Sequence, residues 1–122
     1  MRRGVVTGMG IVSPVGNNRA EVEASLKAGT SGIELNPDQA ERNFRSHVAG
    51  TLKIAPAQHI DKRTLRFKGP GAAYAYISMA QAIADAGLTP DEISHPRTGL
   101  IAGSGGPSTL RLYQAHQEEE KN

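Results

Sequence analysis

A long alanine-rich segment, residues 70–86, constrains the fold more than any other part of the sequence. Ile77 and Ala80 lie at helical spacing within it, which predicts a helix with one apolar face. Pro70 suits the first turn of this helix, and Gly87 is a natural stop. Because most of its side chains are small, we expect another helix to approach it closely.

Two short apolar runs, Gly4 to Thr7 and Gly99 to Ala102, are typical of buried strands, and each is followed by glycines. A second helix is predicted from Asn18 to Gly29, since Asn18 and Glu21 have the spacing of a capping box. The order strand, helix, helix, strand predicts an α/β domain with a largely buried sheet.

The remaining segments carry weaker signals. Residues 30–59 are irregular, with possible short strands at 44–49 and 52–54. Thr89 to Glu92 has the pattern of a capped helical turn. We expect a domain that covers residues 1–108. Residues 109–122 are expected to form a polar, frayed tail.

Composition excludes several classes of protein. The chain has 122 residues, enough for one domain, and its 38% hydrophobic and 21% charged residues are typical of a globular protein. With a net charge of only +2, nucleic-acid binding is not indicated. No secretory signal or membrane span is apparent, so we expect a cytoplasmic protein without a membrane partner. Zero cysteines exclude disulfides, thiolate metal sites and a cysteine nucleophile within these residues.

Two glycine-rich stretches could be mistaken for chemical motifs. Residues 7–10 resemble a dinucleotide loop, but residues 11–14 separate them from the next helix, whose N-terminus would have to face the phosphates. Ser104 follows a predicted strand, yet its flanking residues do not form a nucleophile elbow. We therefore expect no bound cofactor and no catalytic serine.

The four histidines give no sign of a metal or catalytic site. They lie in polar or loop contexts without metal-ligand spacing, at His47, His59, His95 and His116. We predict no metal and no catalytic residue among them.

The basic stretch 61–68 is the most informative exposed feature, with four positive charges against one negative. If it is helical, Lys62 and Arg66 share one face and Arg63 lies beside it. Leu65 and Phe67 would anchor the segment to the body of the protein. Such a surface suits an acidic helix or a phosphate-bearing partner, although a solvated charged face explains the same spacing.

Several stretches, taken together and in this order, resemble the β-ketoacyl-acyl-carrier-protein synthases, most closely the synthase I type. They are RRGVVTGMGIVSPVGNN at 2–18, KAGTSGI at 27–33, FRSHVAG at 44–50, IDKR at 60–63, QAIADAGL at 81–88 and GLIAGSGG at 99–106. The resemblance runs to about residue 108 and corresponds to the opening portion of a much longer enzyme.

This resemblance implies a thiolase-like fold, of which the chain would be the opening part of the N-terminal half in a layered αβαβα homodimer. It also implies fatty-acid biosynthesis by decarboxylative condensation of an acyl thioester with a malonyl carrier protein. The cysteine and two histidines of that chemistry belong to later motifs, and none of them is present. Lys62, Arg63 and Arg66 match residues that dock the acyl carrier protein, and Gly106 matches a glycine near the acyl pocket.

Three functional hypotheses follow. The first is an N-terminal fragment of such an acyltransferase, inactive by itself. The others are a non-catalytic module that binds acyl carrier protein, and a dinucleotide-binding domain. If the first holds, strands near Val5 and Ile101 lack partners, and the chain exposes unpaired edges and apolar faces.

Overall fold

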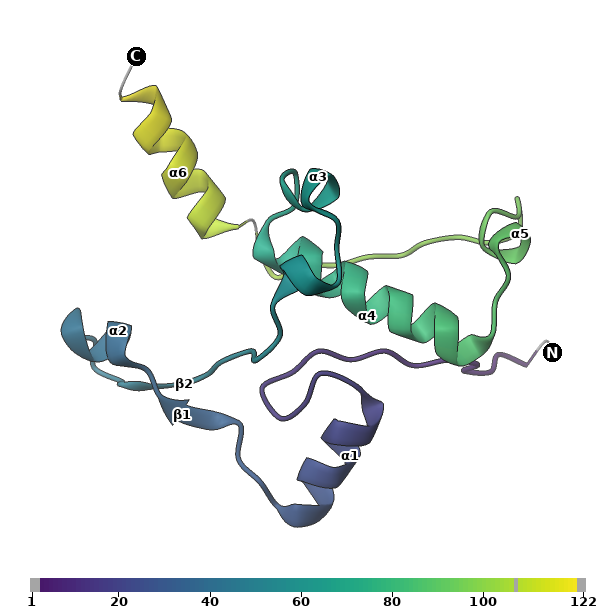
Figure 1. The fold of residues 1–122 in the computed structure, drawn as a ribbon, viewed down its shortest axis with the longest axis horizontal. Coiled ribbons are helices and arrows are strands. Elements are labelled where there is room, and N and C mark those ends of the chain that lie inside the picture. Colours follow the sequence, from purple (N-terminus) through teal and green to yellow (C-terminus); the bar gives the residue numbers. More distant parts are fainter. Residues whose placement is uncertain (1–2, 107, 121–122) are drawn as a thin grey trace.

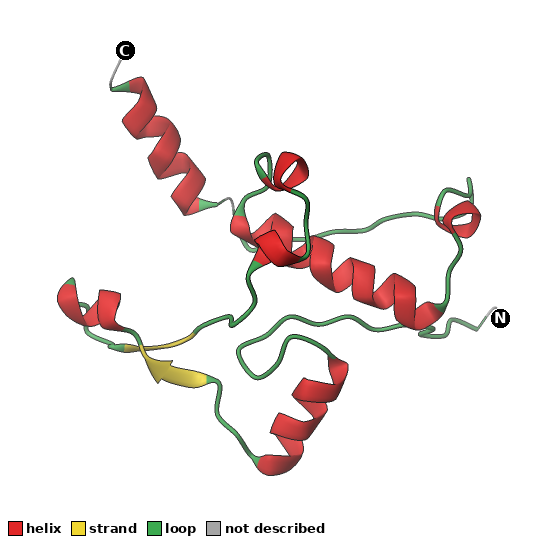
Figure 2. Cartoon of the chain, in the orientation of Figure 1, coloured by secondary structure: helices red, strands yellow, loops and turns green. Residues whose placement is uncertain are grey.

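The computed structural model describes residues 3–106 and 108–120, and it combines helices with one small sheet (Figures 1 and 2). In chain order the elements are α1 (Arg19–Ala28), β1 (Ile33–Leu35), α2 (Pro37–Glu41), β2 (Val48–Gly50), the 3₁₀ helix η1 (Pro56–Gln58), α3 (Lys62–Leu65), α4 (Pro70–Ala86), α5 (Pro90–Ile93) and α6 (Thr109–Glu119).

Helix α4 is the centre of the fold, and its residue range is as predicted. Among the described residues, the buried apolar side chains are Ile60, Ala73 and Ile77, two of them on α4. Leu65 of α3 and Ile54 pack against this cluster and are partly buried. The small core therefore fixes α3 and η1 against the first half of α4.

Helix ends follow the local signals in the sequence. Asn18 caps α1, because its Oδ1 accepts a hydrogen bond from the Glu21 backbone at 3.0 Å. Gly29 and Gly87 end α1 and α4 with φ of 65° and 66°, values that favour glycine. Thr89 caps α5 as predicted, and it does so with a capping box that it forms with Glu92. These predictions are confirmed.

The predicted strands are largely wrong. The sheet consists of β1 and β2, paired antiparallel, and only β2 overlaps a predicted strand. Residues 4–7, 52–54 and 99–102 form no strand. A strand requires a neighbour to pair with, and the described residues offer none to these segments. The largely buried sheet is therefore also contradicted, whereas a chain of mixed helix and strand is confirmed.

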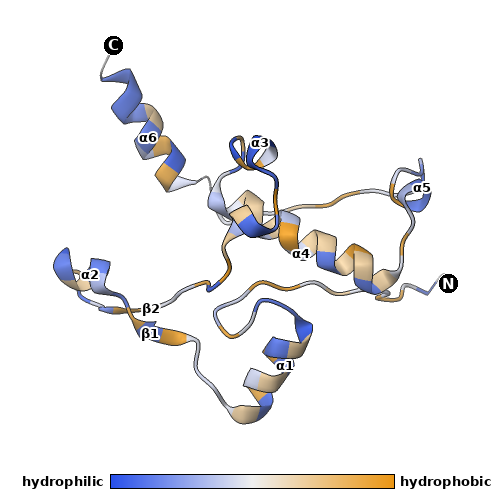
Figure 3. Ribbon diagram, viewed as in Figure 1, coloured by the Kyte–Doolittle hydropathy of each residue, from blue (hydrophilic) through white to orange (hydrophobic). Residues whose placement is uncertain are grey.

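Apolar side chains in the two unpaired segments are open to solvent, as expected for strands without partners. Val6 is 85% exposed and Ile101 is 97% exposed. Figure 3 shows apolar stretches (orange) along the N-terminal trace and along the trace between α5 and α6. The predicted exposure of apolar faces is confirmed.

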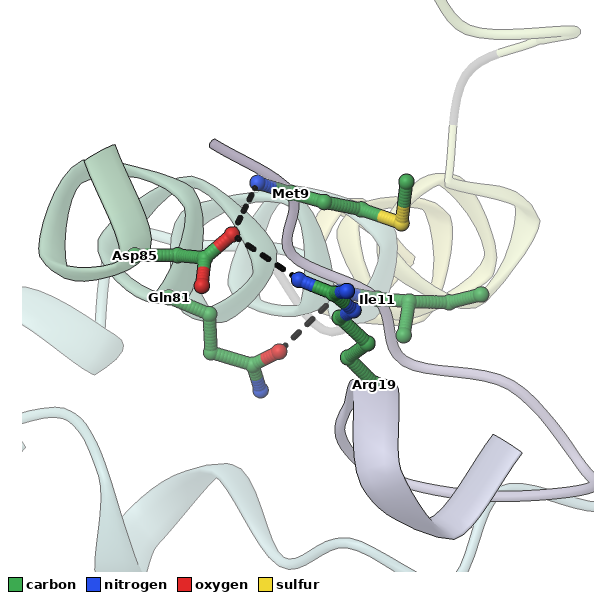
Figure 4. Close-up of polar contacts among 5 residues, drawn as sticks. All are labelled: Met9, Ile11, Arg19, Gln81 and Asp85. Atoms are coloured by element: carbon green, nitrogen blue, oxygen red, sulfur yellow. Dashed lines mark hydrogen bonds and ion pairs between the residues drawn. The ribbon is translucent and has the colours of Figure 1, made fainter. Parts of the chain in front are cut away.

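The N-terminal segment runs along α4 in close backbone contact (Figures 1 and 4). Met9 donates its backbone N–H to Oδ2 of Asp85, and Ile11 donates to Oε1 of Gln81, both at 3.0 Å. A Cβ at Gly8 or Gly10 would overlap backbone atoms of α4. These glycines therefore contact a helix side rather than a helix N-terminus, which contradicts the dinucleotide interpretation.

Residues 109–119 form α6, an exposed helix, where the sequence predicted a frayed tail. Ser108 caps it through a hydrogen bond that its Oγ accepts from the Arg111 backbone. Arg111 also donates to the carbonyl oxygen of Lys68 at 3.2 Å, and so links α6 to the segment after α3. A local cap and this contact explain the helix, while a domain boundary at residue 108 stays a prediction.

Candidate functional site

Helix α3 presents the predicted basic residues on the surface. Asp61 caps it, since Oδ1 of Asp61 accepts a hydrogen bond from the Thr64 backbone at 2.9 Å. Leu65 turns inward and packs against the core, as predicted. Lys62 and Arg63 lie within α3, and Arg66 is its C-terminal cap; all three are exposed. The structure thus brings the three cations together on one short, anchored turn.

These cations lack acidic partners among residues 3–106 and 108–120. The ion pairs that lysine and arginine side chains form in this part of the chain lie elsewhere: Arg19 with Asp85, Lys27 with Glu23, and Lys53 with Glu34. The adjacent carboxylate, Asp61, is used to cap the helix. The surface formed by Lys62, Arg63 and Arg66, hereafter the α3 basic surface, is therefore available to an acidic partner.

Phe67 is where the sequence-based prediction fails. It was expected to anchor the segment, but it is 76% exposed. The guanidinium of Arg66 lies over its ring, 4.7 Å from the ring centre. The inward position of this short turn is filled by Leu65, which packs against the core.

Gly106 lines a separate, open hollow of about 780 Å³ between the start of α4, residues 102–106 and the start of α6. Its backbone N–H donates to Oγ of Ser104, which in turn donates to the Gly106 carbonyl at 2.8 Å. The described lining contains no histidine or carboxylate that could activate this serine. The role of Gly106 beside an acyl pocket stays a prediction, as does the geometric effect of Pro107, which lies outside the described residues.

Within the same described ranges, no group of three or more histidine or carboxylate side chains could hold a metal ion. None of the helices described there has both the length and the hydrophobicity of a membrane-spanning helix.

Comparison with known proteins identifies the family. The model of the β-ketoacyl synthase N-terminal domain matches residues 1–122. The chain belongs to the β-ketoacyl synthase family. The match includes residues 109–122, although the resemblance was predicted to end at about residue 108.

Relatives of this β-ketoacyl synthase chain carry consistent names. It is 61% identical over 105 residues to 3-oxoacyl-[acyl-carrier-protein] synthase 1 of Haemophilus influenzae, covering 86% of the chain and 26% of the relative. It is 50% identical over 109 residues to synthase 1 of Escherichia coli K12, covering 88% and 27%. Synthase 2 of Vibrio cholerae is 37% identical over 117 residues, covering 95% and 28%. The chain thus spans about a quarter of the length of these relatives.

The cap of α3 predicts an acid-sensitive surface in this synthase chain. Hydrogen bonds from the hydroxyl and backbone N–H of Thr64 hold the pKa of Asp61 below its ordinary value of 3.8. A lowered folded-state pKa stabilises α3 above the ordinary pKa, and this contribution is lost as pH falls through the folded value. We expect the Thr64 amide resonance to titrate below about pH 4 and its hydrogen exchange to lose protection there.

Asp61→Asn is the matched control, because asparagine caps helices as well as aspartate and does not titrate. The Thr64 transition should vanish in this variant while α3 persists. A transition that survives in Asp61→Asn would assign the acid sensitivity to another group.

Proposed function

We propose that this chain is the opening part of a condensing enzyme that elongates acyl chains in fatty-acid biosynthesis, and that it contributes scaffold and carrier-protein docking. The observation that carries the proposal is the 61% identity to a 3-oxoacyl-[acyl-carrier-protein] synthase 1. The reaction is the decarboxylative condensation of an acyl thioester with malonyl carrier protein.

A covalent thioester divides this condensation into two easier steps, and it requires a thiolate nucleophile. These residues contain no cysteine, so they cannot form that intermediate by themselves. The chain therefore acts catalytically only as part of a full-length synthase. Gly106 borders the acyl pocket in that complete enzyme.

Docking of the acyl carrier protein takes place on the α3 basic surface. Three features support this assignment: the cations are exposed, they have no acidic partner among the described residues, and Leu65 fixes their helix to the core. Fixed cations guide an acidic partner into one orientation and accelerate its approach.

The complete enzyme has a layered thiolase-like fold and is a cytoplasmic homodimer. The layered fold is supported by the two exposed segments at residues 4–7 and 99–102. Both have the composition of buried strands, and both lack partners within the described residues.

The docking proposal is tested by charge reversal. Lys62→Glu and Arg66→Glu should each weaken binding of a purified bacterial acyl carrier protein by about fivefold, because each replaces an attraction by a repulsion. Binding of the 122-residue chain would be measured by fluorescence anisotropy at low ionic strength, and again at higher salt to measure screening.

Arg45→Glu serves as the matched control, since it makes the same charge change on the turn between α2 and β2, away from α3 (Figure 1). Equal losses in Arg45→Glu and in the two α3 variants would mean nonspecific attraction and would contradict docking at α3.

A further inference from the structure

Phe67 lies beside the α3 basic surface and is a large apolar side chain left almost fully open. It follows Arg66 directly and is 76% exposed. Single exposed apolar residues are common on proteins and need no explanation by themselves. What sets Phe67 apart is its position among cations that have no acidic partner within the described residues.

The backbone that carries Phe67 is held by hydrogen bonds of the turn after α3. The Phe67 backbone N–H donates to the carbonyl of Thr64, and the Lys68 N–H donates to that of Leu65 at 3.0 Å. Leu65 is held by the core. Phe67 therefore projects from a supported turn, so little backbone conformational entropy would be lost when a partner covers it.

Arg66 also covers one part of the ring with its guanidinium, at 4.7 Å. A guanidinium over an aromatic face keeps its N–H donors free at the edges, where they can meet a carboxylate. The pair thus offers an apolar contact and a charge-assisted contact side by side. Arginine and aromatic residues are enriched among the residues that dominate binding energy.

We propose that Phe67 is the apolar anchor of the docking surface, and that its partner is an acidic helix which carries an apolar side chain beside its carboxylates. The proposal rests on the carrier-protein docking proposed above. It specifies the chemistry of the docking helix, since a purely acidic helix would satisfy the cations but leave the ring in water. Lys62 and Arg66 steer the partner, and Phe67 slows its release.

The test is the affinity of Phe67→Ser and Phe67→Leu for a purified bacterial acyl carrier protein across a range of salt concentrations. Phe67→Ser should weaken binding about tenfold with the same salt dependence as the unchanged protein, because no charge is lost. Phe67→Leu keeps apolar area at the same place and should retain most of the affinity. Lys62→Ala, in contrast, should reduce the salt dependence.

Each outcome distinguishes the two proposals. Unchanged affinity in Phe67→Ser, with binding lost in Lys62→Glu, would overturn the anchor and leave docking intact. Phe67→Leu as weak as Phe67→Ser would also overturn the apolar contact. Absence of any binding by the unchanged chain at low salt would overturn both proposals. Circular dichroism would check that the exposed substitutions leave the helices unchanged.

Discussion

Gly10→Val should release the N-terminal segment from α4. A Cβ at residue 10 would overlap the carbonyl oxygen of Ser78, which belongs to the helix backbone and cannot rotate away. Overlaps of this kind typically cost about 1–3 kcal/mol. The backbone N–H groups of Met9 and Ile11 would then lose their acceptors on Asp85 and Gln81. Their hydrogen exchange should accelerate by on the order of a hundredfold, or to the unprotected rate.

Hydrogen exchange followed by NMR measures this directly, amide by amide. Gly4→Ala is the matched control, because nothing lies within 4 Å of a Cβ at that position. It should leave both amides unchanged. Gly8→Ala should resemble Gly10→Val, since its Cβ would overlap the Ala82 carbonyl. Unchanged protection of Met9 and Ile11 in Gly10→Val would show that the segment does not lie along α4 in this way.

The two side chains of α4 that hold the N-terminal segment also contact residues at the start of α1. Oδ2 of Asp85 lies 3.8 Å from a guanidinium nitrogen of Arg19, and Nε2 of Gln81 donates to the Asn17 carbonyl at 2.7 Å. Gln81 and Asp85, one helical turn apart, thus hold both the N-terminal segment and the start of α1 (Figure 4). No local sequence pattern indicates these contacts, because they join residues about seventy positions apart.

Helices α1, α4 and α5 were predictable because their signals are local, whereas α2 and α6 formed where an irregular segment and a frayed tail were expected. Asn18 and Glu21 are three residues apart, and Pro70 and Gly87 mark the two ends of one element. Each signal acts through hydrogen bonds or backbone preferences within a single turn. Boundaries of α1 and α4 therefore follow from the sequence without knowledge of the remaining fold.

Strands were not predictable for the opposite reason. The run Gly4 to Thr7 has a better strand composition than β1, Ile33–Leu35, yet only β1 has a partner within the described residues. Pairing depends on which segments meet in space rather than on composition. Strand propensity in an unpaired segment therefore yields an exposed loop.

The candidate site was predicted in part. Spacing placed Lys62 and Arg66 correctly on one short exposed turn, and Leu65 correctly in the core. Phe67 was misplaced because hydrophobicity alone suggests burial, whereas the inward position of this short turn is already occupied. An apolar residue next to Arg66 could have been recognised as part of a binding surface only once its exposure was known.

The second large effect concerns cooperative unfolding. A compact monomer of 12.9 kDa exposes about 6,300 Å², and a fully unfolded chain of this mass about 19,000 Å². This chain exposes 10245 Å², so it buries markedly less surface than a stable domain of its size. The three buried side chains of its described core cannot offset the conformational entropy of ordering more than a hundred residues.

We therefore expect the 122-residue chain to melt over a broad range without a sharp calorimetric transition, and to bind ANS at its exposed apolar segments. A compact domain of this length would instead absorb about 80 kcal/mol in one transition. Ile77→Ala distinguishes a chain that melts gradually from a compact domain that unfolds in one transition. In a cooperative core this truncation costs about 2–5 kcal/mol and lowers the Tm by many degrees, whereas here it should barely change the melt. A sharp monomeric transition that Ile77→Ala shifts strongly would mean that these residues fold as an independent domain, and that residues 4–7 and 99–102 need no further strands.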